Sequence, residues 1–304
     1  MKFTVTATLP VRTPYRLDLT TDALRRLAAN IVDVVDGAGL YQRVLADDRG
    51  VNAIAVRQRV PDAVEVRIAG RDARRWLPTV ERMLGTDVVL SAFYRRARAV
   101  PWLHALAREL RGLKPPRYPD MWEALCHAIV FQQISIHAAA AIMRRTIGAL
   151  CEPVASPFGT ELYPFPRPRA VLQASDATLR GAGLSANKVA HLRTAADAVL
   201  AGTVSDVSIE ALATEAAIDA LCEVRGIGRW SAAVVLLRGF GRLDVFPMGD
   251  SGVARSVRLI TGDARVNVDA VLEALGPTRG MLYFHLLLGR LRNLGGSPGD
   301  SLGA

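Results

Sequence analysis

A short turn, Gly226-Ile227-Gly228, separates two apolar segments whose apolar residues recur at helical spacing. The first segment carries Ile218 and Leu221 on one face, and the second carries Trp230 and Leu237. Two glycines one residue apart permit positive φ and let the backbone approach another molecule closely. A helix that starts after such a turn presents free N–H groups and its positive dipole end. The pattern therefore predicts two helices around a tight turn, with an anion site at the second helix.

Two features extend this turn. Arg225 and Arg229 flank it and add positive charge beside the anion site. An ordinary helix–helix connection would also use two glycines, but the longer string LCEVRGIGRWSA is more specific. About twenty residues downstream lies Phe246-Pro247-Met248-Gly249-Asp250, whose carboxylate can do chemistry on a bound substrate. The structural alternative for Asp250 is the N-cap of the helix that follows it.

Together these strings resemble the helix-hairpin-helix DNA glycosylase superfamily, which is named for its hairpin, its Gly/Pro-rich loop and its aspartate. Within that superfamily the chain looks like the alkylation-repair branch, 3-methyladenine DNA glycosylase II. The resemblance implies a hairpin at 221–238 that binds DNA backbone through main-chain amides. It also implies a catalytic loop at 244–252 in which Asp250 is essential for base excision. The proline that usually precedes the first hairpin glycine is Arg225 here.

Position 230 separates two mechanisms within this superfamily. Bifunctional members carry a lysine there, which attacks the sugar and forms a Schiff base, whereas this chain has Trp230. Without an amine, covalent catalysis of that kind lacks its nucleophile. The resemblance therefore implies a monofunctional glycosylase with Trp230 as a wall of the base pocket. A core tryptophan on an amphipathic helix is the structural alternative, and one ring can satisfy both.

A glutamine-rich joint, Gln132-Gln133-Ile134, interrupts a helical stripe that begins after Asp120. In the family a joint of this kind carries the side chain that wedges into the gap left by a flipped base. The alternative is a solvated joint before a second helix capped by Ser135. Further on, a Gly-Leu-Ser-x-x-Lys turn that ends at Lys188 also resembles the family. It makes Lys188 a candidate phosphate contact, unless it lies on a solvated helix face.

The charge of the chain agrees with a polyanionic partner. The net charge is +9 and the isoelectric point is about 10.1, with 38 basic residues. Only Lys2, Lys114 and Lys188 are lysines, so nearly all of these residues are arginine, which contacts phosphate in bidentate fashion. A GC-rich genome would also enrich arginine, so charge alone is weak support for DNA binding.

The cysteines and the N-terminus limit which cellular compartment and which cofactors we expect. Cys126, Cys151 and Cys222 have no metal-ligand spacing, and their odd number favours a reduced, cytoplasmic protein. No cysteine follows Cys222, so the iron–sulfur loop of some relatives is absent and no metal site is expected. The first residues lack the uninterrupted apolar run of a signal peptide, and no stretch reaches membrane-spanning length. The one candidate ligand is a monovalent cation at the hairpin.

The chain divides into two regions by pattern. Residues 1–97 read as mixed α/β, with a strand at 3–7, a helix at 22–35 and a hairpin formed by 52–60 and 64–68. Residues 98–304 read as helices and short loops, which predicts an α+β fold. The resemblance implies a small antiparallel α/β domain before an all-α glycosylase region of two helical subdomains.

The resulting hypothesis is a monomeric, monofunctional DNA glycosylase of base excision repair. It would hydrolyse the N-glycosidic bond of a flipped, alkylated purine in double-stranded DNA, with Asp250 stabilising the sugar cation or activating water. Val234 and Ser251 stand where well-known relatives carry tyrosine, which leaves the lesion open. The alternatives are a glycosylase for deaminated or oxidised bases and a non-enzymatic DNA-binding protein that kept the hairpin.

Overall fold

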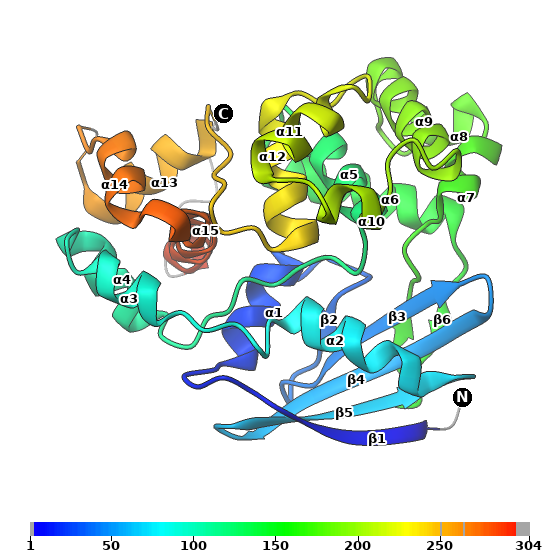
Figure 1. The fold of residues 1–304 in the computed structure, drawn as a ribbon. Coiled ribbons are helices and arrows are strands. Elements are labelled where there is room, and N and C mark those ends of the chain that lie inside the picture. Colours follow the sequence, from blue (N-terminus) through cyan, green and yellow to red (C-terminus); the bar gives the residue numbers. More distant parts are fainter. Residues whose placement is uncertain (1–2, 250, 264, 296–304) are drawn as a thin grey trace.

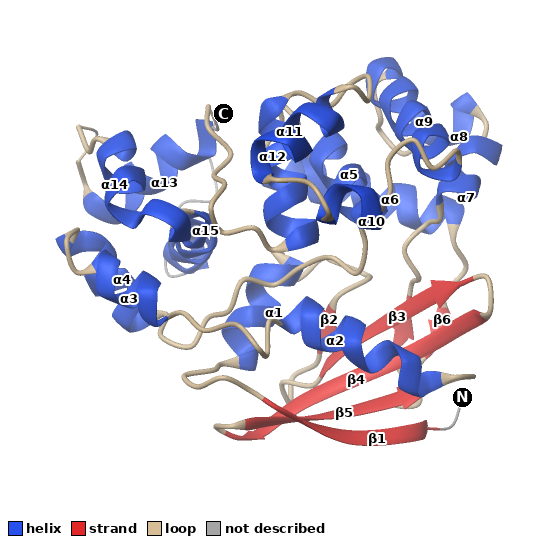
Figure 2. Cartoon of the chain, in the orientation of Figure 1, coloured by secondary structure: helices blue, strands red, loops and turns tan. Residues whose placement is uncertain are grey.

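The computed structural model describes residues 3–249, 251–263 and 265–295. The N-terminal part is a five-stranded antiparallel sheet in the order β1-β5-β4-β3-β2. Figure 2 shows this sheet at one side of the molecule and helices over the rest. The α+β expectation is therefore confirmed. The strands are β1 (Phe3–Pro10), β2 (Val34–Val35), β3 (Tyr41–Asp47), β4 (Gly50–Val60) and β5 (Ala63–Ala69).

The strand expected at 3–7 and the hairpin expected at 52–68 are confirmed as β1 and as β4–β5. The helix expected at 22–35 is wrong, because α1 spans Leu17–Arg25 and the chain turns after it. The Asn30 side chain accepts hydrogen bonds from the amides of Val32 and Asp33, at 2.9 and 3.0 Å. A side chain that binds nearby amides competes with helical hydrogen bonding, so the chain leaves the helix and enters β2.

The helices after the sheet form two clusters (Figure 1). In one, α5 packs against α9 and α12; in the other, α13 packs against α15, and α14 against α3. The helices of the first cluster are α5 (Met121–Val130), α6 (Ile136–Leu150), α7 (Pro168–Gln173), α8 (Asp176–Gly181), α9 (Ala186–Leu200), α10 (Asp206–Glu210), α11 (Thr214–Cys222), α12 (Arg229–Val235) and the π-helix η2 (Leu236–Phe240). Those of the second are α3 (Ser91–Ala97), α4 (Pro101–Glu109), α13 (Ser251–Thr261), α14 (Val268–Leu275), η3 (Gly276–Thr278) and α15 (Gly280–Gly295).

The smaller elements lie between these units. The helix α2 (Leu77–Leu84) follows a 3-10 turn, η1 (Ala73–Trp76), beside the sheet, and a two-stranded pair, β6 (Val154–Ala155) and β7 (Glu161–Leu162), lies in the loop after α6. Asp120 and Ser135 cap α5 and α6, since their side chains accept from the amides of Glu123 and Ala138. The polar residues before these helices therefore set their starts, as the sequence predicts.

A buried ion network ties α5 to the sheet. Arg43 of β3 is 1% exposed and forms ion pairs with Asp33, at 2.8 Å, and with Glu123 of α5. The hydroxyl of Tyr41 donates to the same Asp33 carboxylate at 2.7 Å. Because a buried guanidinium is stable only when its charge is paired, this network holds the N-terminal end of α5 against the sheet. The C-terminal end of the same helix leads into the glutamine-rich joint.

Lys114 provides a stability prediction. Its side chain is buried and its ammonium donates to the Val88 carbonyl at 2.6 Å. Burial lowers the pKa of this ammonium from 10.5 to about 8, against the opposing charge of Asp87. The unfolded chain therefore binds the extra proton more readily, and folding stability should rise with pH between about 8 and 10.5. We expect Lys114→Met to remove this rise, worth about 2–3 kcal/mol.

Urea unfolding of the native chain and Lys114→Met at pH 7.5 and pH 10 measures this difference. An equal pH dependence in both proteins would show that Lys114 is not its source.

Candidate DNA-binding and base-excision site

The predicted hairpin is formed by α11, a turn and α12. Gly226 has a φ of +96°, a conformation that favours glycine, and the amide of Ile227 donates to the Val224 carbonyl at 2.9 Å. Gly228 is the N-cap of α12, with extended backbone and no side-chain cap. The first amides of a helix have no partner within it, so those after Gly228 are available to an anion. The helix α11 begins at Thr214, and Ala213 occupies its N-cap position.

The two hairpin arginines differ in their surroundings. Arg229 is exposed, but its guanidinium contacts two carboxylates of α11, Asp219 at 3.0 Å and Glu215 at 2.5 Å. Its charge is therefore shared before any ligand arrives. Arg225 is also exposed, and its side chain has no ion pair or hydrogen bond within the described ranges. Of the two, Arg225 is the stronger candidate for a phosphate.

The glutamine-rich joint lies against the hairpin, but its three residues point in different directions. The Gln132 side-chain amide donates to the Gly226 carbonyl at 3.0 Å and to the Ser231 hydroxyl at 2.8 Å. Gln133 has a φ of +58° and is exposed, and Ile134 is exposed as well. The fold thus brings the joint and the hairpin together, 94 residues apart in sequence, with two free side chains beyond them.

Trp230 follows the hairpin on α12 and is half-buried. Its indole N–H is buried and has no hydrogen-bond partner among the described residues. Ser231 beside it is buried and holds Gln132. Val234, one turn further, is 2% exposed and packs in the core. Trp230 is therefore packed partly against the core and partly accessible, and its role as a wall of a base pocket stays a prediction.

The predicted catalytic loop has two buried residues followed by two exposed ones before its aspartate. Phe246 and Pro247 are buried, whereas Met248 and Gly249 are exposed. Asp250 itself lies outside the described residues, and α13 begins directly after it, at Ser251. The start of α15 supports the loop, because the amide of Gly280 donates to the Leu243 carbonyl at 2.8 Å. A Cβ at Gly280 would come 2.9 Å from the Val245 carbonyl oxygen, so this contact requires glycine.

A cation–aromatic contact joins three elements and has no signal in the sequence. The Arg26 guanidinium, just after α1, lies 4.4 Å from the centre of the Phe131 ring, at the end of α5. It also donates to the hydroxyl of Tyr283 on α15 at 3.1 Å. No local signal could reveal this contact, because its members are separated by more than 100 residues. It links the joint to the helix that supports the catalytic loop.

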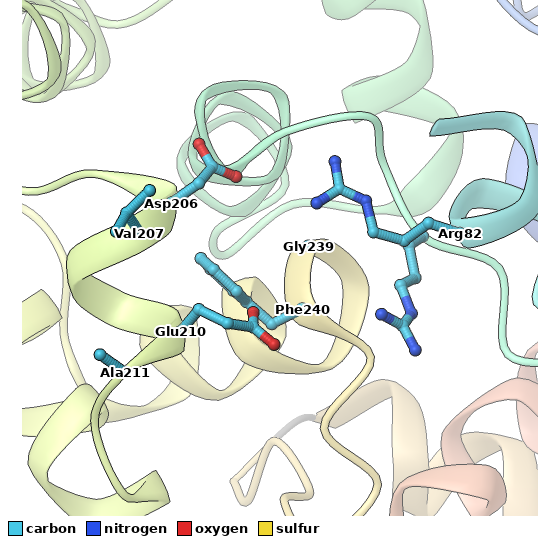
Figure 3. A pocket seen from close by; sticks show the side chains of 8 residues that line it. Arg82, Asp206, Val207, Glu210, Ala211, Gly239 and Phe240 are labelled. Carbon is cyan, nitrogen blue, oxygen red and sulfur yellow. The ribbon is translucent and has the colours of Figure 1, made fainter. Parts of the chain in front are cut away.

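The cavity in Figure 3 lies elsewhere. Its volume is about 430 Å³, and Arg117 is among its lining residues. Figure 3 shows Arg82 on one side, Glu210 on the other and Phe240 between them. Gly239 and Phe240 end the π-helix that continues α12, so the cavity is at the opposite end of this helix from the hairpin. None of the predicted site residues lines it.

Two further properties concern metals and membranes. Within the described ranges, no group of three or more His, Cys, Asp or Glu side chains is arranged to hold a metal ion. The helices of those ranges are all too short or too polar to cross a bilayer.

Comparison with known proteins finds one family model and several relatives that resemble this chain. The family model described as "HhH-GPD superfamily base excision DNA repair protein" matches residues 126–275, which include the joint, the hairpin and the aspartate loop. The "DNA-3-methyladenine glycosylase" of Bacillus subtilis is 27% identical over 192 residues, 63% of each chain. A Mycobacterium tuberculosis protein, "Probable bifunctional transcriptional activator/DNA repair enzyme AlkA", is 28% identical over 263 residues, 82% of this chain and 50% of that one.

The match therefore spans about half to two-thirds of the length of these curated relatives. Among solved structures, the "3-methyladenine dna-glycosylase from Archaeoglobus fulgidus" superposes with a TM-score of 0.78 at 24% identity. That alignment covers 93% of this chain and 98% of the other, so the two share their fold. Residues 126–275 of this chain match the helix-hairpin-helix (HhH-GPD) superfamily of base excision DNA repair proteins.

Proposed function

We propose that this protein is a monofunctional DNA glycosylase that removes alkylated bases from double-stranded DNA. The observation that carries the proposal is the joining of the glutamine-rich joint to the hairpin through Gln132, beside Trp230. This arrangement provides a phosphate grip and a pair of exposed side chains on one surface. Relatives named as 3-methyladenine glycosylases support the alkylated substrate.

Binding begins at the backbone of DNA. The amides at the start of α12 and the exposed Arg225 contact phosphates, which positions the duplex without reading its sequence. A base inside a duplex is out of reach, so the enzyme extrudes it. Gln133 or Ile134 then fills the vacated stack, because both side chains project from the joint next to the hairpin. Gln132 stays on the hairpin and supports them.

Asp250 does the chemistry in this proposal. Cleavage of an N-glycosidic bond builds positive charge on the sugar, and a carboxylate against the sugar stabilises that charge or activates water. In the sequence this residue follows the exposed Gly249 and precedes Ser251, the first residue of α13. A leaving base that is already cationic needs little protonation, so one carboxylate suffices.

Aromatic surface is the expected source of preference for a cationic base. Phe131 already carries the Arg26 guanidinium on its ring, so that face is not open to a second cation. Trp230 is the remaining aromatic candidate beside the hairpin. Because Val234 replaces a second aromatic residue, we expect a narrower set of methylated purines than an all-aromatic pocket accepts.

The monofunctional assignment makes a prediction. With Trp230 in place of a lysine, no amine is available to form a Schiff base with the sugar. We expect base release to leave an intact abasic strand, and borohydride to trap no enzyme–DNA adduct. Gel electrophoresis of a labelled lesion duplex after borohydride treatment measures this. A trapped adduct would make the enzyme a glycosylase/lyase with a different nucleophile.

The proposal extends to the organisation of the chain. In this proposal the sheet within residues 1–97 shapes a side of the DNA-binding surface and residues 98–304 form most of the glycosylase region, which α3 (Ser91–Ala97) joins by packing against α14. The enzyme acts as a monomer without an iron–sulfur cluster, and a monovalent cation occupies the hairpin. Light scattering of the purified protein tests the monomeric state, and potassium titration of its DNA affinity tests the cation.

The experiment that tests the function is base release from methylated duplex DNA, with the released bases separated by chromatography. We expect methylated purines to accumulate with time and enzyme concentration. If none is released, a panel of deaminated and oxidised bases follows. Activity on that panel would change the lesion, and inactivity on every base would leave a DNA-binding protein.

A further inference from the structure

The helix α9 supports both the joint and the hairpin. Lys188, in its first turn, points its ammonium at the end of α5 and donates to the carbonyls of Val130, at 2.7 Å, and Gln132, at 3.0 Å. The last carbonyls of a helix have no partner within it, and a lysine there is favourable. Lys188 is therefore not directed at a phosphate in the free protein, in contrast to one of the sequence interpretations.

The same face of α9 contacts the hairpin one turn later. His191 lies against Gly226, where a Cβ would come 2.3 Å from a ring carbon. Residues three apart share a helix face, so Lys188 and His191 hold the joint and the hairpin from one side. Gln132 joins the two from the other side, through its bonds to Gly226 and Ser231. The three contacts close a ring of α9, joint and hairpin.

The joint needs such support because its backbone is strained. Gln133 is held at a φ of +58°, which a residue with a side chain adopts at a cost. Residues in such conformations persist when their surroundings fix them. Here the Lys188 ammonium binds the carbonyl of Gln132, directly before Gln133, and that of Val130, three residues before it.

We propose that Lys188 and Gln132 are positioning residues that fix the wedge side chains, Gln133 and Ile134, relative to the phosphate-binding hairpin. This inference rests on the proposed function. When the hairpin binds a phosphate, the wedge then lies at a fixed distance from that phosphate. DNA binding therefore places the wedge where it can fill the gap left by the extruded base. Neither residue touches DNA in this role.

The first measurement is amide hydrogen exchange of the free protein, which needs neither DNA nor activity. In Lys188→Met, the amides of residues 132–136 should exchange at least tenfold faster than in the native chain, because the joint loses its support. Lys188→Arg keeps two donors for the same carbonyls and should restore most of the protection. Circular dichroism and thermal unfolding establish that each variant is folded, and Gln132→Leu provides a second variant if Lys188→Met is not.

The second measurement uses duplex DNA with a stable abasic-site analogue and 2-aminopurine beside it, so that insertion raises the fluorescence without any bond cleavage. Lys188→Met should lose most of the fluorescence change, while the salt dependence of its binding stays that of the native protein. Arg225→Met is the matched control. It should retain the fluorescence change at saturation and reduce the slope of log K against log salt by about 0.9, the value of one phosphate contact.

Two results would overturn the inference. A reduced salt slope in Lys188→Met, like that of Arg225→Met, would make Lys188 a phosphate contact. Native exchange and native fluorescence in both Lys188→Met and Gln132→Leu would mean that neither residue positions the joint. If the native protein itself gives no fluorescence change and no preference for the abasic duplex, the proposed function fails, and this inference fails with it.

Discussion

Asp250→Asn should abolish release of methylated bases while leaving DNA binding intact. Asparagine keeps the size of the side chain but cannot carry the negative charge that stabilises the sugar cation. Loss of a single electrostatic contact of this kind lowers turnover on the order of 10²–10³-fold, and we expect at least that. Single-turnover base release from methylated DNA, with DNA affinity measured alongside by fluorescence anisotropy, checks both halves of the expectation.

Asp244 provides the matched control within the same loop. It is an exposed carboxylate whose side chain accepts from the hydroxyl of Thr214 at 2.7 Å, away from the anchor at Phe246. Asp244→Asn removes an equal charge from the loop and should retain nearly all activity. Equal losses in the two variants would indicate that the net charge of the loop matters, and not one carboxylate. Full activity of Asp250→Asn would require another residue to perform the chemistry.

Local sequence patterns predict much of the fold and part of the candidate site. The hairpin glycines, the aspartate loop and the caps at Asp120 and Ser135 all act within a few residues, so composition and spacing can reveal them. The prediction of a helix at 22–35 was wrong, and the cause is also local. Apolar spacing suggested a helix there, and the competing side-chain hydrogen bonds of Asn30 decided otherwise.

Contacts between distant segments could not be predicted from the sequence. Arg26 on Phe131 joins the N-terminal region to the end of α5, and Lys188 reaches carbonyls 56 and 58 residues away. Each of these residues has an ordinary local context, and its role arises only when the elements pack. The pairing of Arg229 with two carboxylates of α11 is of the same kind, and it changes which hairpin arginine is available.

Alanine substitutions at the two hairpin glycines should have different effects, because different atoms surround the two positions. An alanine at Gly226 would place its Cβ 2.3 Å from His191 while holding a φ of +96°. The strained backbone costs roughly 1–3 kcal/mol, and overpacking adds a similar amount. We therefore expect Gly226→Ala to lower the free energy of unfolding by about 2–5 kcal/mol, as measured by urea denaturation.

Gly228→Ala separates stability from binding. Nothing lies within 4 Å of a Cβ there and its φ of −96° suits any residue, so the variant should lose at most about 1 kcal/mol of stability, the cost of alanine at an N-cap. If the hairpin holds a phosphate on its amides, the added methyl group would lie where the DNA backbone must approach. Affinity for duplex DNA should then fall about tenfold or more, which corresponds to about 1.4 kcal/mol. Undiminished affinity in this stable variant would mean that DNA does not come close to the Gly228 backbone, and the phosphate grip would have to lie elsewhere on the surface.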